Sequence, residues 1–475
     1  MQPFSHAFKE SADRALENAT QRRALGKVRL EFGAKRAKTV ARLPEFDALK
    51  DQAKTIKDHV LENLDFYLET FEEKVTANGG HVHWCRTPEE ACDAVLGLCR
   101  DAGARTVAKG KSMITEEIGL NAFLEANGIT PVETDLGEYI VQLRNEPPSH
   151  ITAPAVHLNK EQIADAFRDG HKDLDPARPL DEPQELLDEA RAVLRDSFIE
   201  ADVGITGANF LIAETGSTVI VTNEGNGDLS QTLPKIHIVV TSIEKMVPTL
   251  EDAMTILRLL ARSATAQEIT SYTTFSTGPK RADDLDGPEA FHVVLLDNGR
   301  SDLLGGEFRE VLRCIRCGAC QTLCPVWGAV GGHAYGWVYS GPIGAVLSPA
   351  LIGIEEARHL PEASTFCGMC ESVCPMRIPL PKLMRRWREK AFEKKYTPGV
   401  TRYGIGLWAL FAKRPALYRL PVRVVIALLA RIGRRKGRFR RLPFAGGWTA
   451  HRDLPAPQGG TFMDQWRSRG GRSAR

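Results

Sequence analysis

Apolar side chains recur at helical spacing through the first 75 residues of the chain. The clearest stretch, residues 46–75, reads "FDALKDQAKTIKDHVLENLDFYLETFEEKV" and repeats an apolar position every three or four residues. This period predicts amphipathic helices. We therefore expect a helical N-terminal extension over residues 1–75.

The pattern changes after residue 75. Short apolar runs, "HVHW", "TVAKG" and "TPVETD", alternate with two longer segments that end in glycine, "PEEACDAVLGLCRDAG" and "TEEIGLNAFLEANG". Strands that alternate with helices indicate βαβ units and a parallel sheet.

The alternation continues to about residue 298. A helix predicted for "PQELLDEARAVLRDSFIEA" leads into "NFLIAETGSTVIVTNEGN", which reads as two strands joined through Gly216. A strand and a helix follow in "IHIVVTSIEKMVPTLEDAMTILRLLAR", and further strands are predicted in "EITSYTTFST" and "FHVVLLD". We expect residues 76–298 to form one α/β domain with an open, mostly parallel sheet.

Strand patterns end at about residue 300. Residues 299–390 mix short apolar stretches with glycine and predict a helical domain, and residues 391–475 predict a basic C-terminal extension. A chain of 475 residues exceeds one ordinary core, which agrees with several domains.

Composition narrows the function classes. The net charge of +2 gives no argument for nucleic acid, and no apolar stretch reaches the roughly 18 residues of a membrane-spanning helix. The N-terminus lacks the apolar segment of a signal peptide. Seven of the ten cysteines fall in two short clusters, which favours a reducing compartment, so we expect a cytoplasmic protein.

The two cysteine clusters align in frame. Residues 314–325 read "CIRCGACQTLCP" and residues 364–375 read "STFCGMCESVCP". The spacing C-x2-C-x2-C-x3-C-P is typical of iron-sulfur proteins, in which the fourth cysteine of each run binds the cluster held by the other run. One predicted ligand set is Cys314, Cys317, Cys320 and Cys374. The other is Cys324, Cys367 and Cys370.

The second set is one thiolate short, because Ser364 stands where the first run has Cys314. Three chemistries fit this gap: a three-iron cluster, a four-iron cluster with a non-cysteine ligand, or an open iron. Ser364 is the candidate eighth ligand, and its alternative role is an ordinary Ser-Thr turn. A pair of zinc sites is the alternative for the whole motif, but zinc knuckles do not need the third cysteine.

Several cysteine, histidine and polar residues outside the two cysteine clusters have either a functional or a structural role. We expect Cys85, Cys92 and Cys99 to be buried core cysteines, and His333 to pack near the clusters rather than bind them. Polar residues near two glycine turns suggest a small-molecule pocket in the α/β domain, although loop chemistry explains them nearly as well. These are Lys109, Lys111, Ser112, Glu117, Glu214, Thr215, Asn223, Glu224 and Asn226. The sequence contains no recognisable flavin, nicotinamide or ATP motif.

The C-terminal extension concentrates positive charge. Eight basic residues lie between Arg423 and Arg441, around the short apolar run "VVIALLA". Such a segment suits an anionic membrane face or an acidic partner protein.

The combination of motifs resembles a known family. The α/β segments "KSMITEEIGLN", "VGITGANFLIAETGSTVIVTNEGN" and "PKIHIVVTSIEKMVPTLEDA" occur together with "CIRCGACQTLCPV", "GGHAYGWVYSGPIGAVLSP" and "CGMCESVCPMRIPL". Over roughly residues 10–470 the chain resembles the iron-sulfur subunit of the bacterial L-lactate utilisation system, the lactate utilisation protein B family.

The resemblance implies a fold and a function. It implies an α/β domain distantly like sugar-phosphate isomerases and coenzyme A transferases, followed by an all-α, ferredoxin-like domain with two four-iron clusters. The family's cluster ligands map onto the seven cysteines of the two clusters and leave the eighth ligand unassigned. Companion subunits are implied, with which the family oxidises L-lactate to pyruvate.

Two functional hypotheses follow. In the first, the chain is a non-catalytic redox subunit that passes electrons from lactate through its clusters to a membrane acceptor. In the second, its α/β pocket, with Glu117, Glu214 and Glu224, binds a hydroxy acid or a coenzyme A-like ligand, and the clusters are accessory. A redox sensor with a labile cluster is a third, weaker hypothesis.

Overall fold

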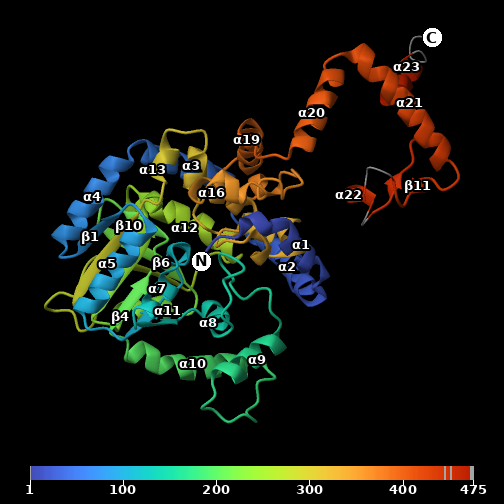
Figure 1. The fold of residues 1–475 in the computed structure, drawn as a ribbon. Coiled ribbons are helices and arrows are strands. Elements are labelled where there is room, and N and C mark those ends of the chain that lie inside the picture. The colour runs from blue at the N-terminus through green and yellow to red at the C-terminus, as the bar shows by residue number, and fades with distance from the viewer. Residues whose placement is uncertain (1, 443–445, 450–451, 471–475) are drawn as a thin grey trace. The chain divides into compact units, whose positions relative to one another are not determined.

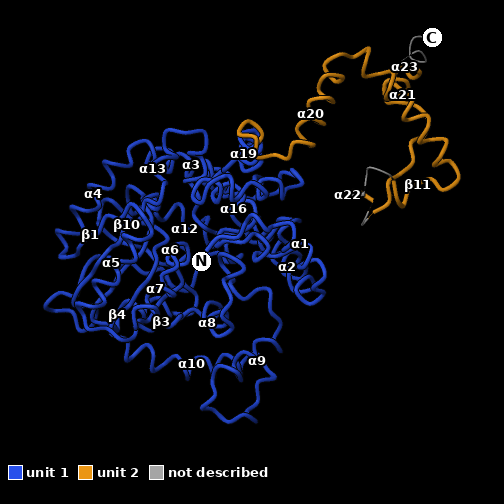
Figure 2. The backbone as a smooth tube through the Cα atoms, in the orientation of Figure 1, with its two compact units in different colours: residues 1–391 blue, residues 392–475 orange. Residues whose placement is uncertain are grey.

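The computed structural model describes residues 2–442, 446–449 and 452–470. The chain divides into two compact units, residues 1–391 and residues 392–475 (Figure 2). The larger unit contains the α/β sheet and the cysteine clusters, and the smaller one contains the C-terminal helices.

A six-stranded sheet forms the centre of the first unit, in the order β1-β10-β7-β4-β2-β3. Its strands are β1 (His81–Cys85), β2 (Thr106–Lys109), β3 (Thr130–Glu133), β4 (Val203–Thr206), β7 (Ile236–Ser242) and β10 (Ala290–Leu296). All five pairings are parallel, which confirms the predicted open, mostly parallel sheet. Strand β4 was not predicted, because four fully buried residues show neither alternation nor a long apolar run.

A second sheet of four strands lies beside the first, in the order β8-β5-β6-β9. Its strands are β5 (Phe210–Ile212), β6 (Ser217–Thr222), β8 (Met246–Val247) and β9 (Tyr272–Ser276). Strands β5 and β6 pair antiparallel through the predicted turn at Gly216, whose φ of 68° favours glycine.

Apolar layers cover both faces of the six-stranded sheet. Helices α5 (Pro88–Asp101), α6 (Met113–Ile118) and α7 (Leu120–Ala126) pack on one face, where Val294 and Leu296 of β10 point. Helix α4 (Leu64–Ala77) packs on the other face, against Val293 and Leu295 (Figure 1). This alternation along β10 is the two-residue period of a strand that is buried on both sides.

One predicted helix is in fact two. The segment "TEEIGLNAFLEANG" breaks at Gly119 between α6 and α7, because Gly119 takes a left-handed φ of 69° that ends the first helix. Three further helices, α8 (Leu136–Leu143), α9 (Lys160–Gly170) and α10 (Pro183–Ile199), share a separate apolar cluster. Helices α11 (Asn226–Thr232) and α12 (Leu250–Ala264) complete the α/β region.

The other N-terminal helices, α1 (Phe8–Glu17), α2 (Ala19–Ala41) and α3 (Phe46–Glu62), pack beside the cysteine region (Figure 1). Arg36 of α2 donates a hydrogen bond to the Val373 carbonyl at 2.9 Å, and Lys50 of α3 donates to the Ser372 carbonyl at 3.3 Å. Helices α2 and α3 therefore stabilise the second cysteine run through hydrogen bonds to its backbone carbonyls.

The cysteine region is helical, as predicted. It contains α13 (Ser301–Leu304), α14 (Ala319–Thr322), α15 (Trp327–Val330), α16 (Gly341–Leu351), α17 (Ile354–Ala357), α18 (Met369–Ser372) and α19 (Leu380–Glu393). The proposed limits of the four regions, 1–75, 76–298, 299–390 and 391–475, stay predictions.

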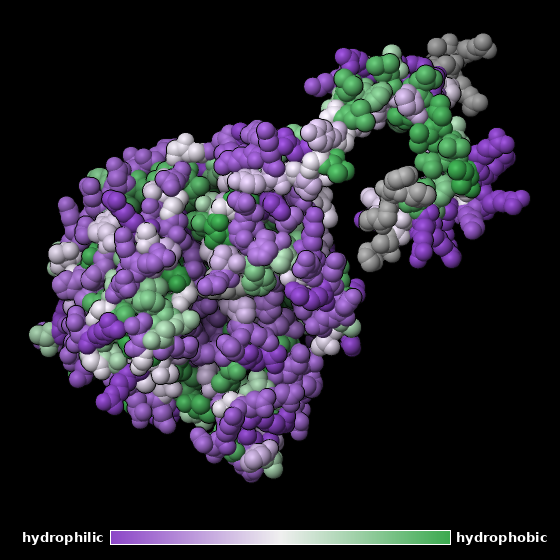
Figure 3. All heavy atoms as spheres, viewed as in Figure 1, coloured by the Kyte–Doolittle hydropathy of each residue, from purple (hydrophilic) through white to green (hydrophobic). Residues whose placement is uncertain are grey.

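The second unit presents apolar helices. It contains α20 (Gly399–Ala412), α21 (Pro415–Gly433), α22 (Gly446–Thr449) and α23 (Phe462–Gly470), and a two-residue pair, β11 (Arg438–Phe439) with β12 (Leu454–Pro455). That pair corrects the expectation that no strand follows residue 300. Helix α20 has no buried residue among its 14, and Figure 3 shows apolar side chains gathered on this unit. In the described ranges, no helix is long and apolar enough to cross a membrane.

Candidate functional site

The two cysteine runs share one backbone conformation. Arg316 and Phe366, each just before a cysteine, have positive φ angles of 57° and 52°. Gly318 and Gly368, each just after that cysteine, have φ angles of 70° and 79° and begin the four-residue helices α14 and α18. The in-frame alignment read from the sequence is therefore also a structural repeat.

The first cavity in this repeat combines cysteines from both runs. Its cysteines are Cys314, Cys317, Cys320 and Cys374. Apolar side chains, among them Ile343, Met376 and Ile378, complete its wall. Four thiols around one small cavity fit a four-iron cube, in which each thiolate binds a different iron. The four cysteines that the spacing assigns to one cluster therefore line one cavity, and their role as its ligands stays a prediction.

The second cavity is lined by three cysteines and by Ser364. The cysteines are Cys324, Cys367 and Cys370. The Phe366 N–H donates to Ser364 Oγ at 3.1 Å, just as the Arg316 N–H donates to Cys314 Sγ at 3.4 Å. Ser364 Oγ thus makes the Ser-Thr turn in the position that Cys314 Sγ has in the first run, and its role as the eighth ligand stays a prediction.

Burial controls the protonation of these thiols. It raises the pKa of Cys317 and Cys370 to about 12 and that of Cys374 to about 11. The exposed Cys367 differs, because a backbone N–H from Met369 lowers its pKa. The buried thiols become thiolates only when a metal supplies positive charge, which is how cysteine-bound metals deprotonate their ligands.

Within the described part of the chain, no three His, Cys, Asp or Glu side chains converge on a point that could hold one metal ion. A cube does not require such convergence, because its thiolates are spread over four irons. The pair of cavities, each with its own cysteines, therefore fits two clusters.

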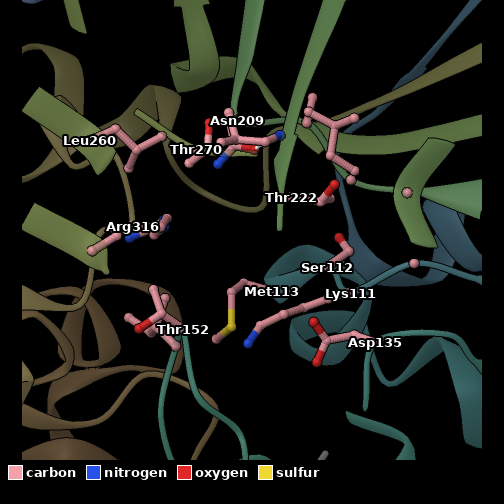
Figure 4. Close-up of a pocket in the computed structure, with 18 of the residues that line it drawn as sticks. Lys111, Ser112, Met113, Asp135, Thr152, Asn209, Thr222, Leu260, Thr270 and Arg316 are labelled. Carbon is pink, nitrogen blue, oxygen red and sulfur yellow. Dashed lines mark hydrogen bonds between the residues drawn. The ribbon is translucent and has the colours of Figure 1, made fainter. Parts of the chain in front are cut away.

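A larger cavity of about 220 Å³ lies in the α/β domain (Figure 4). Its lining includes Lys111, Asp135, Gly207 and Lys245, which follow the carboxyl ends of β2, β3, β4 and β7. Ligands of open parallel sheets bind at this edge, because the loops after the strands meet there. In Figure 4, Lys111 and Arg316 enter the cavity from facing sides.

The structure brings together only part of the predicted polar set. Lining the cavity are Lys111, Ser112, Asn223, Glu224 and Asn226. Four others lie elsewhere. Lys109 is fully buried and pairs with Glu133 at 2.6 Å. Glu214 Oε2 accepts the Leu250 N–H at the start of α12, and Thr215 Oγ1 donates to Ser217 Oγ.

The fourth residue outside the cavity, Glu117, belongs to a buried ion-pair network. Its carboxylate accepts hydrogen bonds from Arg300 at 2.9 and 2.7 Å and from the Tyr339 hydroxyl at 2.5 Å. Burial alone would raise the pKa of Glu117, but the guanidinium of Arg300 outweighs burial and holds the pKa below its usual range. Glu117 therefore joins the α/β domain to the cysteine region, where Tyr339 lies, and is not free to bind a ligand.

The remaining candidates have packing roles, as expected. His333 donates through Nε2 to the Pro147 carbonyl at 2.7 Å and lines neither cysteine cavity. Cys85, Cys92 and Cys99 lie in the apolar core, where burial raises the thiol pKa values to between about 11 and 12.

Sequence reasoning missed two basic residues of the large cavity, Lys245 and Arg316. Arg316 lies inside "CIRCGAC", a segment that was interpreted only for its cysteines, and Lys245 lies in "TSIEKMV", where two charged residues follow a buried strand. Ile151 and Arg316 line both this cavity and the first cysteine cavity, so the two cavities share a wall. The charge of "IEK" at the end of a buried strand was the available signal.

Comparisons with known families match three regions. Residues 68–296 match the LUD domain, residues 310–378 match the 4Fe-4S dicluster domain, and residues 395–471 match the C-terminal region of lactate utilisation protein B. The dicluster match indicates two iron-sulfur clusters of the four-iron type.

Relatives match over nearly the whole chain. A lactate utilization protein B from Bacillus licheniformis is 44% identical over 467 residues, which is 97% of this chain and 96% of the relative. An uncharacterized electron transport protein from Escherichia coli, YkgF, is 43% identical over 96% of this chain and 95% of its own. The crystal structure of a DUF162 family protein from Deinococcus radiodurans matches 49% of this chain and 98% of its own chain at 14% identity, with a TM-score of 0.28.

Proposed function

Because this chain belongs to the lactate utilization protein B family, we propose that it is the iron-sulfur subunit of a complex that oxidises L-lactate to pyruvate. In this role the chain is a non-catalytic redox subunit. Companion subunits remove electrons from lactate, and this chain carries the electrons to the next acceptor. The complex supports growth on lactate and works in the cytoplasm, at the inner face of the membrane.

One observation carries this proposal: two crossed cysteine sets line two neighbouring cavities. Cys314, Cys317, Cys320 and Cys374 would hold the first cluster. Cys324, Cys367 and Cys370 would hold the second, with Ser364 Oγ as the candidate eighth ligand. Helices α14 and α18 contact each other, which keeps the two sites close. Bound clusters supply reversible one-electron chemistry, and the protein supplies their spacing, burial and nearby charges.

The surroundings of the two sites suit a relay. The first site is mostly buried, and Arg36 and Lys50 place positive charge near Cys374, which favours the negatively charged thiolates. The second site reaches the surface through Cys367, which is exposed. Electrons would therefore exchange with another protein on the Cys367 side.

The C-terminal unit supports a peripheral membrane contact. Exposed apolar residues recur along α21 at Leu417, Leu420, Val424, Leu428 and Ile432, a spacing that places them on one helix face. A basic segment follows directly. This basic segment consists of Arg434, Arg435, Lys436 and Arg438. An apolar face next to clustered positive charge suits an anionic lipid surface.

The test combines this chain, purified without oxygen, with its companion subunits. The chain alone should contain about eight irons, the content of two four-iron clusters. Adding L-lactate to the complex should bleach the cluster absorbance, whereas adding it to the chain alone should not.

Two alanine variants make the test specific. Cys374→Ala should lose iron from the first site and abolish lactate-dependent reduction of an artificial acceptor that accepts electrons from this chain. Cys92→Ala removes a buried cysteine of the apolar core and should keep both iron and electron transfer. Undiminished electron transfer in Cys374→Ala, with its iron lost, would contradict the relay.

A further inference from the structure

Three basic side chains enter the large cavity of the α/β domain: Lys111, Lys245 and Arg316. We infer that this cavity binds a small organic carboxylate that carries a hydroxyl or oxo group, with Arg316 and Lys245 binding the carboxylate. The relay proposed above does not require such a site, and the inference rests on that proposal only in its choice of L-lactate as a probe.

The cationic groups of the cavity lack sufficient partners in the described chain. Lys245 and Arg316 are each only 7% exposed. The Nε and Nη1 atoms of Arg316 and the Nζ atom of Lys111 are buried and have no hydrogen-bond partner among the described residues. Each cation has one carboxylate nearby, Glu244 for Arg316 and Glu138, at 3.8 Å, for Lys111. The N–H groups that lack a partner are still costly to bury, and a bound anion would accept hydrogen bonds from them.

The charge balance of this wall also favours an anion. Arg316 Nη2 lies 3.0 Å from Glu244 Oε1, but Arg300 Nε lies 2.9 Å from the other oxygen of the same carboxylate. Glu117, the other buried carboxylate of the network, pairs with Arg300. On this wall two carboxylates thus face three cations, Arg300, Arg316 and Lys245. The other carboxylates of the cavity lining, Asp135 and Glu224, lie near each other and near Lys111, so the excess positive charge is local to Arg316 and Lys245.

The opposite side of the cavity provides groups for a hydroxyl or oxo substituent. Thr222 Oγ1 is buried and has no hydrogen-bond partner in the described chain, and the Ser112 hydroxyl and the Asp135 carboxylate line the same space. Figure 4 shows Thr222, Ser112 and Asp135 on the side facing Arg316. A ligand with a carboxylate at one end and a hydroxyl or oxo group at the other matches this division.

Arg316 also connects this ligand site to the first cysteine cavity. It lies between Cys314 and Cys317, and its N–H donates to Cys314 Sγ at 3.4 Å. Its guanidinium carbon lies 4.6 Å from the centre of the Tyr339 ring, which holds the side chain over the cavity. An anion on Arg316 would place negative charge beside the first cluster and should lower its reduction potential, because added negative charge disfavours electron uptake.

The experiment is isothermal titration calorimetry on the complete chain with its clusters, purified without oxygen and without companion subunits. L-lactate should bind at one site. Propane-1,2-diol, which has the lactate hydroxyl but no carboxylate, should not bind. Inorganic phosphate should bind more weakly than L-lactate. Equal binding of the diol, tighter binding of phosphate, or no heat with L-lactate, pyruvate or acetate would overturn the inference.

Matched lysine variants test the assignment of the residues. Lys245→Met keeps the length of the side chain and removes its charge, and it should weaken L-lactate binding at least about tenfold. Lys235→Met changes an exposed lysine at the opposite end of β7 and should leave binding unchanged. If Lys245→Met does not fold, Lys111→Met removes another cation of the cavity lining and should also weaken L-lactate binding, because it lowers the positive potential of the cavity. Unchanged affinity in the folded variant would overturn the role of the lysine.

A redox titration of the wild-type chain gives a second readout. Saturating L-lactate should lower the reduction potential of one cluster, and Lys245→Met should need more ligand for the same shift. An unchanged potential with ligand bound would overturn the proposed contact with the first cluster. Calorimetry does not depend on electron transfer. Loss of lactate-dependent electron transfer in the complex and absence of L-lactate binding by the cavity can therefore be distinguished.

Discussion

Replacing Arg300 tests whether the buried network joins the two parts of the first unit. Arg300 is fully buried, and it reaches Glu117 of α6 and Glu244 after β7. Arg300→Met removes the guanidinium and keeps the apolar volume. Both carboxylates then stay buried without their main counter-charge, while Tyr339 still donates to Glu117.

The expected cost follows from this arrangement. Removing one partner of a buried ion pair costs about 3–5 kcal/mol, because the other charge stays in a poorly solvated place. Arg316 still faces Glu244 at 3.0 Å, so Glu244 keeps a partner and the loss should stay within that range. At about 2–4 °C per kcal/mol for a domain of this size, the unfolding temperature should fall by roughly 10 °C.

The assay is thermal and urea unfolding followed by two probes, far-ultraviolet circular dichroism and cluster absorbance, because a chain with several domains does not have to unfold in one step. Both probes should shift, since Tyr339 belongs to the cysteine region. The control Arg386→Met breaks an exposed pair with Glu307 and should change stability far less.

A second variant identifies the cause. Glu117→Gln added to Arg300→Met removes one stranded charge and should recover part of the lost stability. A loss below about 1 kcal/mol in Arg300→Met, or no recovery in the double variant, would refute the reasoning from unpaired buried carboxylates.

Three further predictions concern other parts of the chain. Ser364→Cys should place a thiol where Ser364 Oγ already accepts the Phe366 N–H, and should slow loss of the second cluster to a chelator; an unchanged rate would mean that the fourth ligand lies elsewhere. Changing the basic segment to glutamate should release the chain from anionic liposomes in a sedimentation assay. Salt at 1 M should have the same effect, because the Debye length falls to about 3 Å. Sedimentation that neither treatment alters would argue against the membrane contact. Burial lowers the pKa of His237 in the folded chain to about 3, whereas the ordinary pKa of histidine is about 6.5. As pH falls below about 6.5, this histidine is protonated only in the unfolded chain, which destabilises the fold. Between pH 7 and 5.5, the His237→Gln variant should therefore lose about 1 kcal/mol less stability than wild type, and an equal loss would contradict this prediction.

Local patterns predicted much of the α/β fold. The short apolar strands, the glycine-ended helix α5 and the Gly216 hairpin were each predictable from a few neighbouring residues. The two features that were not predicted, strand β4 and the helix break at Gly119, also depend on a few neighbouring residues. Strand β4 is too short to show a period, and the break at Gly119 depends on one left-handed residue within an otherwise helical segment.

The cysteine spacing alone predicted two iron-sulfur clusters. Cysteine spacing predicts which thiolates can share a cube, because the first three positions of each run lie within one short turn of chain and the fourth cysteine binds the cluster of the other run. The in-frame comparison also located Ser364 as the position that lacks a cysteine. Which charged residues are available to a ligand depends instead on the fold. Glu117 and Arg316 both carry charge in polar stretches, yet Arg300 neutralises Glu117, whereas Arg316 is left with buried donors facing a cavity. That difference depends on partners distant in the sequence, since a charge is free or paired according to what the fold places within a few ångströms of it.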